Sequence, residues 1–344
     1  MLIVNIGVLY ICSTEEARLL IRKRGILISL TMEIKKLTEE GNQKVIEDLY
    51  CSSELTRQAP NHLITLLVLN AFVLITAFLE NTIILAALRR ESSLHPPSKL
   101  LYRNLAITDL CVGIIVEPFY VSYWVSAVFK RWNIRRYALA TSIVAGYTLT
   151  GVSLLTLAAI SVDRLLALLL RNRYRHAVTL KRAYIAVILI WVVPIVGGTM
   201  YFFNRVVTLW YGNINIFICL LTTIFCYTKI FITLRHNQIQ VQEHVSTQRQ
   251  TRQATPLNMA RYRKAVSSAL WLQLTLVVCY LPYGVAVAST PQGGVPLSFL
   301  LARHYSGTLV YLNSSLNPLL YCWKIREIRQ AVKETLRQLG CLPG

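Results

Sequence analysis

Seven long apolar segments constrain this 344-residue chain more than any other feature. A helix needs about 20 mostly apolar residues to cross about 30 Å of hydrocarbon. The chain is 54% hydrophobic and 15% charged, whereas soluble domains carry about 25% charged residues. We therefore predict an all-α membrane protein, a bundle of seven transmembrane helices. The expected spans are residues 62–88, 99–125, 137–167, 183–203, 208–234, 265–289 and 297–322.

The basic residues predict the orientation of these spans. The formal net charge is +20, and Lys and Arg gather in the loops after the first, third and fifth spans and after the seventh. Such an excess is typical of cytoplasmic loops, so we expect the carboxyl end in the cytoplasm and the amino end outside the plasma membrane. The positive charges lie between apolar runs and not along one face, which argues against a nucleic-acid partner. The basic residues at 130–136, on the expected outer side, form either an outward patch or a helix end that snorkels to the lipid headgroups.

Three parts are expected along the chain. Residues 1–60 form a mobile extracellular segment, residues 61–323 the seven-helix domain, and residues 324–344 an amphipathic helix with a short cytoplasmic tail. In the last part apolar residues recur at helical spacing among basic ones, and such a stripe favours a helix lying in the membrane plane.

The seventh span carries polar residues that need a structural reason. Asn313 and Asn317 are four residues apart, so they share one face of a helix. Pro318 has no backbone N–H, so the carbonyl of Ser314 loses its helical partner. In hydrocarbon that carbonyl must be satisfied by a neighbouring side chain, a hydroxyl or a water molecule. The pattern predicts a wet, polar seam inside the bundle.

Asp109, midway along the second span, is the group expected to face this seam, with Ser153 and Asn81 close by. An ionisable group in the hydrocarbon costs about 2.5–3.5 kcal/mol, so its retention indicates a role. The set is either a site for a small hard cation such as sodium or a satisfied polar network that holds the helices together. The spacing does not decide between these two.

Asp163 and Arg164 end the third span at its expected cytoplasmic side. One interpretation is a basic helix end that snorkels to the headgroups. The other is a switch, in which Asp163 holds Arg164 in one state and releases it to a partner in another. The adjacent acid favours the switch, because an anchor needs no counter-charge.

Seven motifs occur along the chain, each in its own span: Asn81, "NLAITDL" (104–110), "DRL" (163–165), Trp191, Tyr227, "CYLP" (279–282) and "NPLLY" (317–321). In this order they resemble the rhodopsin-like (class A) family of G-protein-coupled receptors. The resemblance covers residues 62–338, and two absences, of a loop disulfide and of a proline in the fifth span, are similar to the melanocortin, cannabinoid and adenosine branch.

The resemblance implies a receptor that passes an extracellular ligand signal to a heterotrimeric G protein, with membrane lipids around it and no catalytic residues. It implies an allosteric sodium ion, the one cofactor or metal expected, held by Asp109, Ser153, Asn313 and Asn317. Cys322 or Cys341 is a candidate for lipidation. The residues implied in the activation switch are Asp163, Arg164, Tyr227, Tyr280, Pro282, Asn317, Pro318 and Tyr321.

Two positions depart from the family pattern near the switch. Tyr280 replaces the usual tryptophan of the sixth span, which leaves its rotamer role open. Tyr262 stands where many members carry an acid that binds the arginine of the third span, so that salt bridge is missing, and elevated basal activity is a hypothesis that follows.

The ligand class is narrowed by what is missing from the spans. The seventh span has no lysine for a retinal Schiff base. Gly146 stands where aminergic receptors carry an aspartate, so a peptide, lipid or nucleoside is favoured over a monoamine. An aromatic belt at the membrane interface explains the outer aromatics equally well. The residues expected in a ligand pocket are Glu117, Phe119, Tyr120, Gly146, Tyr280, Tyr283 and Tyr311.

Two other classes of membrane protein compete with the receptor. A transporter or channel would show internal repeats, paired broken helices or more charge within the membrane, and none is present in the sequence. An enzyme would need a nucleophile with a base or a cluster of metal ligands, but the six histidines are scattered over loops and span ends. We therefore favour the receptor and predict no enzymatic activity.

Overall fold

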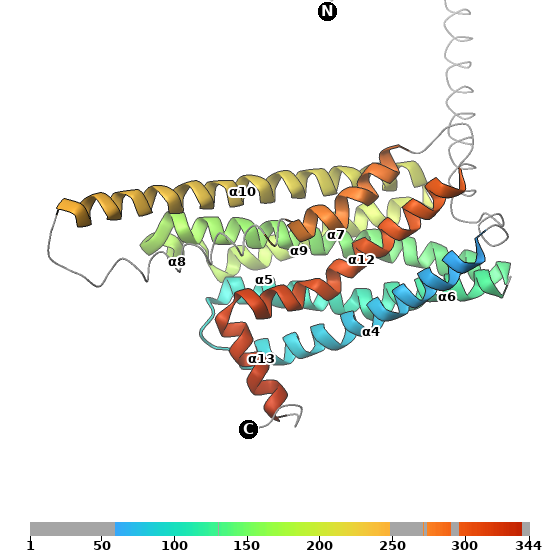
Figure 1. The fold of residues 1–344 in the computed structure, drawn as a ribbon, viewed down its shortest axis with the longest axis horizontal. Coiled ribbons are helices and arrows are strands. Elements are labelled where there is room, and N and C mark those ends of the chain that lie inside the picture. Colours follow the sequence, from blue (N-terminus) through green and yellow to red (C-terminus); the bar gives the residue numbers. More distant parts are fainter. Residues whose placement is uncertain (1–58, 130, 248–270, 272–273, 290–295, 339–344) are drawn as a thin grey trace, which may run out of the picture.

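The computed structural model describes residues 59–129, 131–247, 271, 274–289 and 296–338, and this part consists of helices and their connections, with no strand. The long helices lie alongside one another in one elongated bundle (Figure 1). Nearly all of the expected extracellular segment, residues 1–58, falls outside the described ranges. The helices are α4 (Pro60–Arg90), α5 (Pro96–Cys111), η1 (Val112–Val116), α6 (Glu117–Val128), α7 (Trp132–Leu170), η2 (Arg171–Arg173), α8 (Tyr174–Ala177), α9 (Leu180–Thr199), η3 (Met200–Phe202), α10 (Arg205–Thr247), α12 (Leu297–Lys324) and α13 (Arg326–Gln338).

Five helices of the described part are long and apolar enough to cross a membrane, and they coincide with the first five expected spans. Residues Leu274–Ala288 form a shorter apolar helix in the sixth expected span, while residues 265–270 of that span lie outside the described ranges. The seventh expected span is the 28-residue helix α12, which contains the polar residues of the seam. The count of seven crossings stays a prediction.

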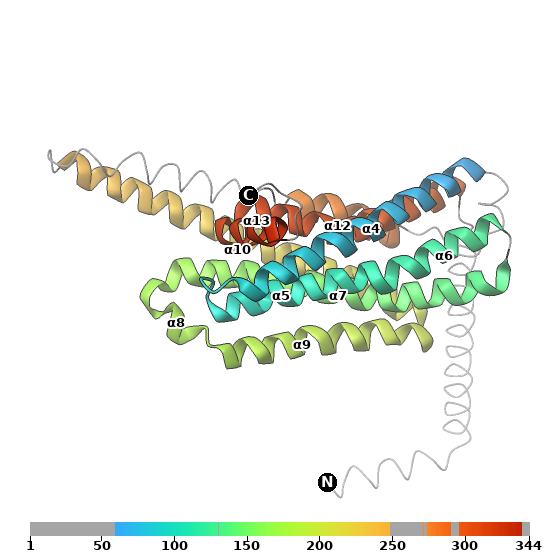
Figure 2. The same cartoon turned by 90° about the horizontal axis from the view of Figure 1, so that it is seen from below.

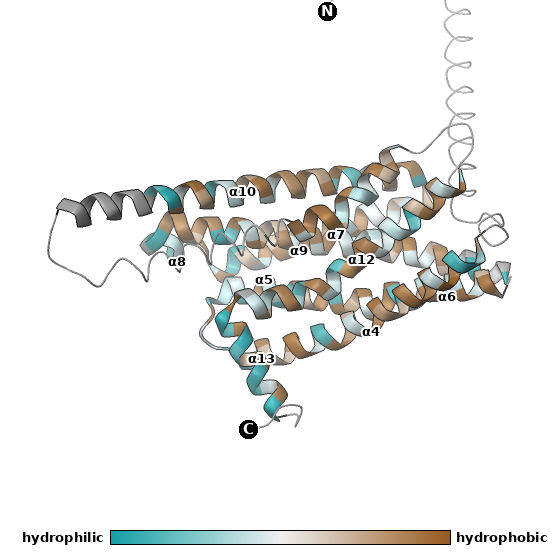
Figure 3. Ribbon diagram, in the orientation of Figure 1, coloured by the Kyte–Doolittle hydropathy of each residue, from teal (hydrophilic) through white to brown (hydrophobic). Residues whose placement is uncertain are grey.

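Helix α7 runs through the middle of the bundle, with α9 on one side and α4 and α12 on the other (Figure 2). Its membrane window is 56% buried, whereas that of α9 is 17% buried. Apolar side chains of α9 such as Ile188 and Leu189 therefore point outward, and brown apolar colour covers the long helices while α13 is largely teal (Figure 3). An all-round apolar helix on the outside of a bundle is what a lipid solvent permits.

The second span is not one continuous α-helix. A π-helical segment, η1, separates α5 from α6, and Pro118 follows it in the first turn of α6. A proline at this point has no N–H to offer the preceding turn, and a locally widened turn relieves the clash of its ring. Gly113 in η1 lets α4 come close, because a Cβ there would lie 3.0 Å from the backbone nitrogen of Phe78.

Two helix ends differ from the apolar boundaries. α10 continues to Thr247, although the apolar run was expected to end near residue 234. Hydropathy marks where a helix leaves the hydrocarbon and not where its backbone hydrogen bonds stop. The backbone of Ile325 is extended, and α13 follows it and lies across the end of the bundle (Figure 1). Ile328 of α13 is fully buried in the main core cluster.

Candidate functional site

Asp109 lies at the centre of a buried polar network that we call the Asp109 seam: Asn81, Asp109, Ser153, Asn313 and Asn317. The Asp109 side chain is completely buried. Ser153 Oγ of α7 donates to its Oδ1 at 3.1 Å, and Asn317 Nδ2 of α12 donates to its Oδ2 at 2.8 Å. One carboxylate thus joins α5, α7 and α12.

The carbonyl of Ser314 receives the donor that Pro318 cannot supply. Asn81 Nδ2 of α4 donates to this carbonyl at 2.9 Å and to the carbonyl of Ala77 at 2.8 Å. The sequence prediction that a neighbour satisfies Ser314 is confirmed. α12 therefore continues through its internal proline while remaining tied to α4.

Asn313 faces a different partner from the one expected. Its Nδ2 donates to the hydroxyl of Tyr280 at 3.2 Å, and no bond to Asp109 is recorded among the described contacts. Tyr280 is buried and its ring lines the cavity described below. The residue that replaces the family's tryptophan therefore touches both the cavity and the seam.

A second carboxylate organises the Asp163 cluster: Ser98, Asp163, Arg164 and Tyr174. Ser98 Oγ donates to Asp163 Oδ2 at 2.8 Å, and the Tyr174 hydroxyl donates to Oδ1 at 2.6 Å. The Arg164 guanidinium is 3.4 Å from Oδ2, and the Arg164 side chain is 41% exposed. The guanidinium also lies 5.5 Å from the centre of the Tyr102 ring. Arg164 is thus held by one ion pair and one ring.

Tyr174 contributes a neutral hydroxyl to this cluster. Burial, together with its bond to Asp163, raises the pKa of Tyr174 to about 12. The hydroxyl therefore remains a hydrogen-bond donor throughout the physiological range. Sequence analysis missed Tyr174 and Ser98, because neither belongs to a motif and only the fold brings them to Asp163.

The other expected switch residues lie around these two networks. Tyr321 is buried, with its ring 5.2 Å from that of Tyr102, and its hydroxyl has no hydrogen-bond partner within the described residues. Tyr227 packs on the small cluster that contains Leu165. Pro282 lies exposed in the helix Leu274–Ala288. Their switch roles stay predictions, as does that of Tyr262, which lies outside the described residues.

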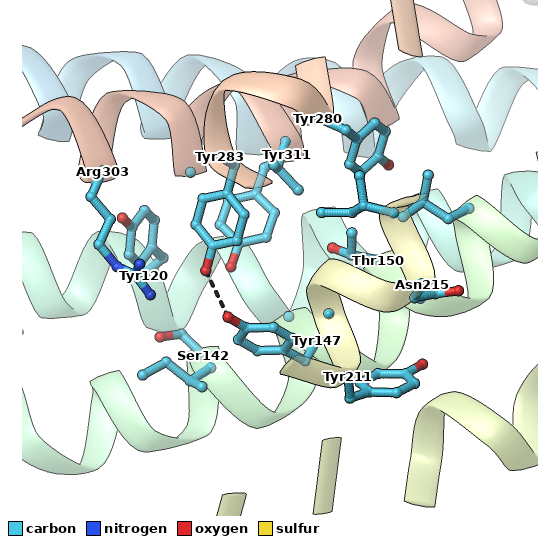
Figure 4. A pocket seen from close by; sticks show the side chains of 18 of the residues that line it. Tyr120, Ser142, Tyr147, Thr150, Tyr211, Asn215, Tyr280, Tyr283, Arg303 and Tyr311 are labelled. Atoms are coloured by element: carbon cyan, nitrogen blue, oxygen red, sulfur yellow. Dashed lines mark hydrogen bonds between the residues drawn. The ribbon is translucent and has the colours of Figure 1, made fainter. Parts of the chain in front are cut away.

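A cavity opens between α6, α7, α10, α12 and the helix Leu274–Ala288 (Figure 4). It contains about 720 Å³ of empty space, including the part that opens to solvent. The hydroxyls of Tyr147 and Tyr283 are 2.9 Å apart across it. Gly146 leaves room for Tyr311, because a Cβ at Gly146 would lie 2.5 Å from the Tyr311 hydroxyl.

Five of the expected pocket residues line this cavity, and two do not. Tyr120, Gly146, Tyr280, Tyr283 and Tyr311 are on its wall. Neither Glu117, which is completely buried, nor Phe119, which is 40% exposed, belongs to the lining. The sequence could not show how the turn of η1 places Glu117 and Phe119. Their part in ligand binding stays a prediction.

Arg135 fits neither interpretation of the basic residues at 130–136. Its side chain is 2% exposed, so it neither forms an outward patch nor snorkels to the headgroups. Its Nη2 donates to the Tyr123 hydroxyl at 3.3 Å, and the guanidinium lies 5.0 Å from the centre of that ring. Aromatic rings of α6 replace water around this charge.

Sequence analysis also missed Arg303 and His304, which line the cavity. Both are buried in α12, and His304 Nδ1 is 3.1 Å from the Tyr120 hydroxyl. The available signal was a basic pair inside an expected span, which is costly and so indicates a role. The two cysteines considered for lipidation are not tested: Cys322 is half-buried against the core, and Cys341 is outside the described ranges.

Comparison with known proteins identifies the family of this chain. The model of the family described as "7 transmembrane receptor (rhodopsin family)" matches residues 80–209 and 199–321. The chain belongs to this family. Both the Asp109 seam and the Asp163 cluster lie within the matched residues.

Curated relatives of this receptor are themselves receptors. The chain is 23% identical over 279 residues to melanocortin receptor 5 of Rattus norvegicus, covering 76% of this chain and 81% of that protein. It is 24% identical over 339 residues to 5-hydroxytryptamine receptor 1B of Mus musculus, covering 80% and 87%. It is 22% identical over 329 residues to probable G-protein coupled receptor 45 of Homo sapiens, covering 80% and 82%. The predicted rhodopsin-like, multi-pass character is confirmed, and the predicted alternative of a transporter or channel is not favoured.

Proposed function

We propose that this receptor carries an extracellular ligand signal across the plasma membrane to a heterotrimeric G protein. The chain crosses the membrane seven times, with residues 1–60 outside and the amphipathic helix and tail of residues 324–344 in the cytoplasm. The observation that carries the proposal is the position of Tyr280, whose ring lines the cavity and whose hydroxyl accepts from Asn313 of the seam. A ligand that moves this ring changes the packing of α12.

The Asp163 cluster supports the other half of the proposal. Arg164 is 41% exposed and bound to Asp163 by one ion pair. The Asp163 carboxylate is only 4% exposed, but it also accepts hydrogen bonds from Ser98 and Tyr174, so it keeps two partners when a docking protein replaces it as the partner of Arg164. Two states of the bundle suffice to transmit the signal. In one state Arg164 pairs with Asp163, and in the other it binds the G protein. The ligand shifts the populations of the two states.

The test is a second-messenger assay in transfected cells, first without ligand and then with a panel of peptides, lipids and nucleosides. We expect the wild type to exceed empty cells in at least one condition. Arg164→Ala removes this signal while its amount at the cell surface stays unchanged. The matched control is Arg173→Ala, an exposed arginine nearby that has no contact with Asp163 in the described structure. Full signalling by Arg164→Ala contradicts the switch.

We also propose that the Asp109 seam holds a sodium ion. A carboxylate with a hydroxyl oxygen 3.1 Å away suits a small hard cation. Asp109 and Ser153 would supply the oxygens, while Asn317 orients the carboxylate through the bond from its amide. The amide of Asn313 contacts Tyr280, which supports an indirect role for this residue. The bound ion would neutralise the buried charge and favour the state described here.

The sodium site is tested by thermal unfolding of the purified receptor. Sodium chloride should raise the midpoint above that in choline chloride at equal ionic strength, because a ligand of the folded state stabilises it by mass action. Asp109→Asn should remove the difference. Asp163→Asn is the control, because its carboxylate is outside the seam, and it should keep the difference. A sodium effect that persists in Asp109→Asn contradicts the proposal.

A further inference from the structure

The charged side chains of α13 are sorted onto different sides of that helix. The exposed acids Glu327 and Glu334 are seven residues apart, so they share one side. The basic residues follow one another at spacings of three and four residues, so they form a stripe along another side. We call this stripe the cationic flank: Arg326, Arg329, Lys333 and Arg337. Like charges at these spacings destabilise a helix on its own, so the stripe needs a partner of opposite charge.

The cationic flank borders the apolar side of α13. Ile325, Val332 and Leu336 are half-buried and recur at helical spacing on that side. Arg329 comes four residues after Ile325 and three before Val332, and it is half-buried as well, whereas Lys333 is exposed. The stem of such an arginine lies along apolar surface while its charged end reaches a polar layer. An amphipathic helix with this arrangement places its cations at the level of the lipid headgroups.

The acidic side of α13 has a different neighbour. Glu327 lies within electrostatic range of the Tyr102 hydroxyl. The Tyr102 ring in turn lies 5.5 Å from the Arg164 guanidinium. The acids are therefore on the side of the Asp163 cluster, where we propose that the G protein docks. The cationic flank lies on another side of the helix, so a protein bound at Arg164 does not account for it.

Two more basic residues lie at the same end of the bundle. Ile328 of α13 belongs to the core cluster that contains Leu88 of α4, so α13 packs against the last turns of α4 (Figure 1). Arg89 and Arg90 end α4, and both are exposed. Within the described ranges, neither these two arginines nor the cationic flank forms an ion pair with an acid. Their combined field attracts an anion to the junction of α4 and α13.

We propose that the cationic flank binds a membrane lipid whose headgroup carries several phosphates, a polyphosphoinositide. Neighbouring members of the flank are about 5–6 Å apart at their Cβ atoms. One headgroup with several phosphates can therefore contact two or three of them, whereas a headgroup with a single charge pairs with one. Arginine and lysine are both good phosphate ligands. The acyl chains pack beside the apolar side of α13. The inference rests on the proposed function in one respect, that α13 lies at the cytoplasmic leaflet.

The experiment measures dissociation constants on the full-length receptor in neutral detergent by microscale thermophoresis. The probes are dioctanoyl phosphatidylinositol bisphosphate, dioctanoyl phosphatidylserine and inositol trisphosphate. We expect the bisphosphate lipid to bind at least tenfold more tightly than phosphatidylserine, because each further cation engaged near a membrane surface contributes about a factor of five. Inositol trisphosphate should bind more weakly than the bisphosphate lipid, because it has no acyl chains to lie beside the apolar side.

Three variants test the position of the charges. Arg329→Gln with Lys333→Gln should weaken binding of the bisphosphate lipid about 20-fold, since two cations are lost. Lys333→Glu with Glu334→Lys exchanges two neighbouring charges and keeps the net charge, and it should weaken binding about tenfold or more. Arg173→Gln with Arg175→Gln is the matched control, because it removes two exposed cations elsewhere in the chain. The control should bind within about twofold of the wild type.

Four results overturn the proposal. The first is equal affinity of the wild type for the bisphosphate lipid and phosphatidylserine. The second is inositol trisphosphate binding as tightly as the lipid, which indicates a soluble phosphate ligand. The third is full affinity in the charge exchange, and the fourth is an equal loss in the control, which indicates net charge alone. The wild-type comparisons decide by themselves should the variants not fold.

G-protein nucleotide exchange, measured with the same samples in nanodiscs of phosphatidylcholine alone, separates this inference from the proposed function. Selective lipid binding without exchange on any G protein contradicts the receptor function only. Exchange by a receptor that does not distinguish the two lipids contradicts this inference only. If exchange in these lipid-free conditions falls in Arg329→Gln with Lys333→Gln and no lipid binds selectively, the flank is a protein docking surface and the proposal is wrong.

Discussion

Two buried carboxyl groups of the receptor, those of Asp109 and Asp163, differ in how their surroundings are fixed. Asp109 receives its hydrogen bonds from α7 and α12, two long helices of the bundle. Asp163 receives one from Ser98 near the start of α5 and one from Tyr174 in the short helix α8. Its third partner, Arg164, is 41% exposed. The Asp109 seam is built into the bundle, whereas the Asp163 cluster lies at its edge.

This difference indicates which network is suited to change partners. Breaking the Asp109 seam leaves buried polar groups unsatisfied, and each costs about 1–3 kcal/mol. Releasing Arg164 leaves a guanidinium that solvent already reaches and a carboxylate that still accepts from Ser98 and Tyr174, so the cost is smaller than in the seam. We expect substitutions in the seam to act mainly on stability, and substitutions in the cluster to act mainly on the balance of signalling states. Three substitutions test this contrast, in order of decreasing effect.

Asn81→Ala should destabilise the receptor most. It removes the donor to the Ser314 carbonyl, which Pro318 cannot replace. We expect the free energy of unfolding to fall by about 1–3 kcal/mol, the cost of an unsatisfied buried group. The measurement is thermal or denaturant unfolding of the purified protein. Thr82→Val is the control, because the Thr82 hydroxyl bonds only to its own helix, at the Phe78 carbonyl. Equal stability of both variants contradicts a structural role for Asn81.

Tyr280→Phe tests the contact between the cavity and the seam. It keeps the buried ring and removes the hydroxyl that accepts from Asn313. The stability loss should be about 1 kcal/mol, the usual net contribution of one hydrogen bond. The potency of any agonist found in the panel should fall while surface expression persists.

Tyr283→Phe provides the comparison for Tyr280→Phe. It removes a hydroxyl that lies 2.9 Å from the Tyr147 hydroxyl, across the cavity and not in the seam. If the two variants lose the same agonist response at the same receptor amount, the special position of Tyr280 is refuted.

Tyr174→Phe should change stability least and signalling balance most visibly. It deletes the 2.6 Å bond to Asp163 from a residue that is only half-buried. With this bond lost, Asp163 is held less firmly in the cluster, which favours the state in which Arg164 is released. A shift of about 1 kcal/mol in the equilibrium between the two states gives about a fivefold rise in basal second messenger. Tyr184→Phe, at an exposed tyrosine of α9, is the control. Unchanged basal signalling in Tyr174→Phe argues against the releasable cluster.

The same tyrosine makes a pH prediction. The pKa of Tyr174 is raised to about 12 in the folded receptor. A raised tyrosine pKa contributes stability below the ordinary value near 10, and that contribution is lost as the pH rises through about 12. Tyr174 therefore stays protonated and keeps its bond to Asp163 between about pH 6 and 9. Any part of the basal signalling that depends on this bond should not change over that range.

The apolar pattern predicted which segments form lipid-facing helices, and their ends to within a few residues for the first four spans. It could do so because hydrocarbon imposes length and composition on each span separately. The polar motifs predicted Asp109, Ser153 and Asn317 as neighbours for a related reason, since a costly group in hydrocarbon must find partners. Arg303 and Tyr174 could not be assigned in this way. Whether a basic residue points to lipid, to water or into a cavity depends on the rotation of its helix, which hydropathy does not report.

The sequence alone therefore determined the solvent of this protein, its helical spans and the need for a donor at the Ser314 carbonyl, because each follows from backbone chemistry in hydrocarbon. Only the tertiary structure decided that Asn81 is that donor, that Asn313 contacts Tyr280 and that Arg303 lines the cavity. Such pairings join residues up to 233 positions apart in the chain, and they depend on how the helices are rotated and packed against one another.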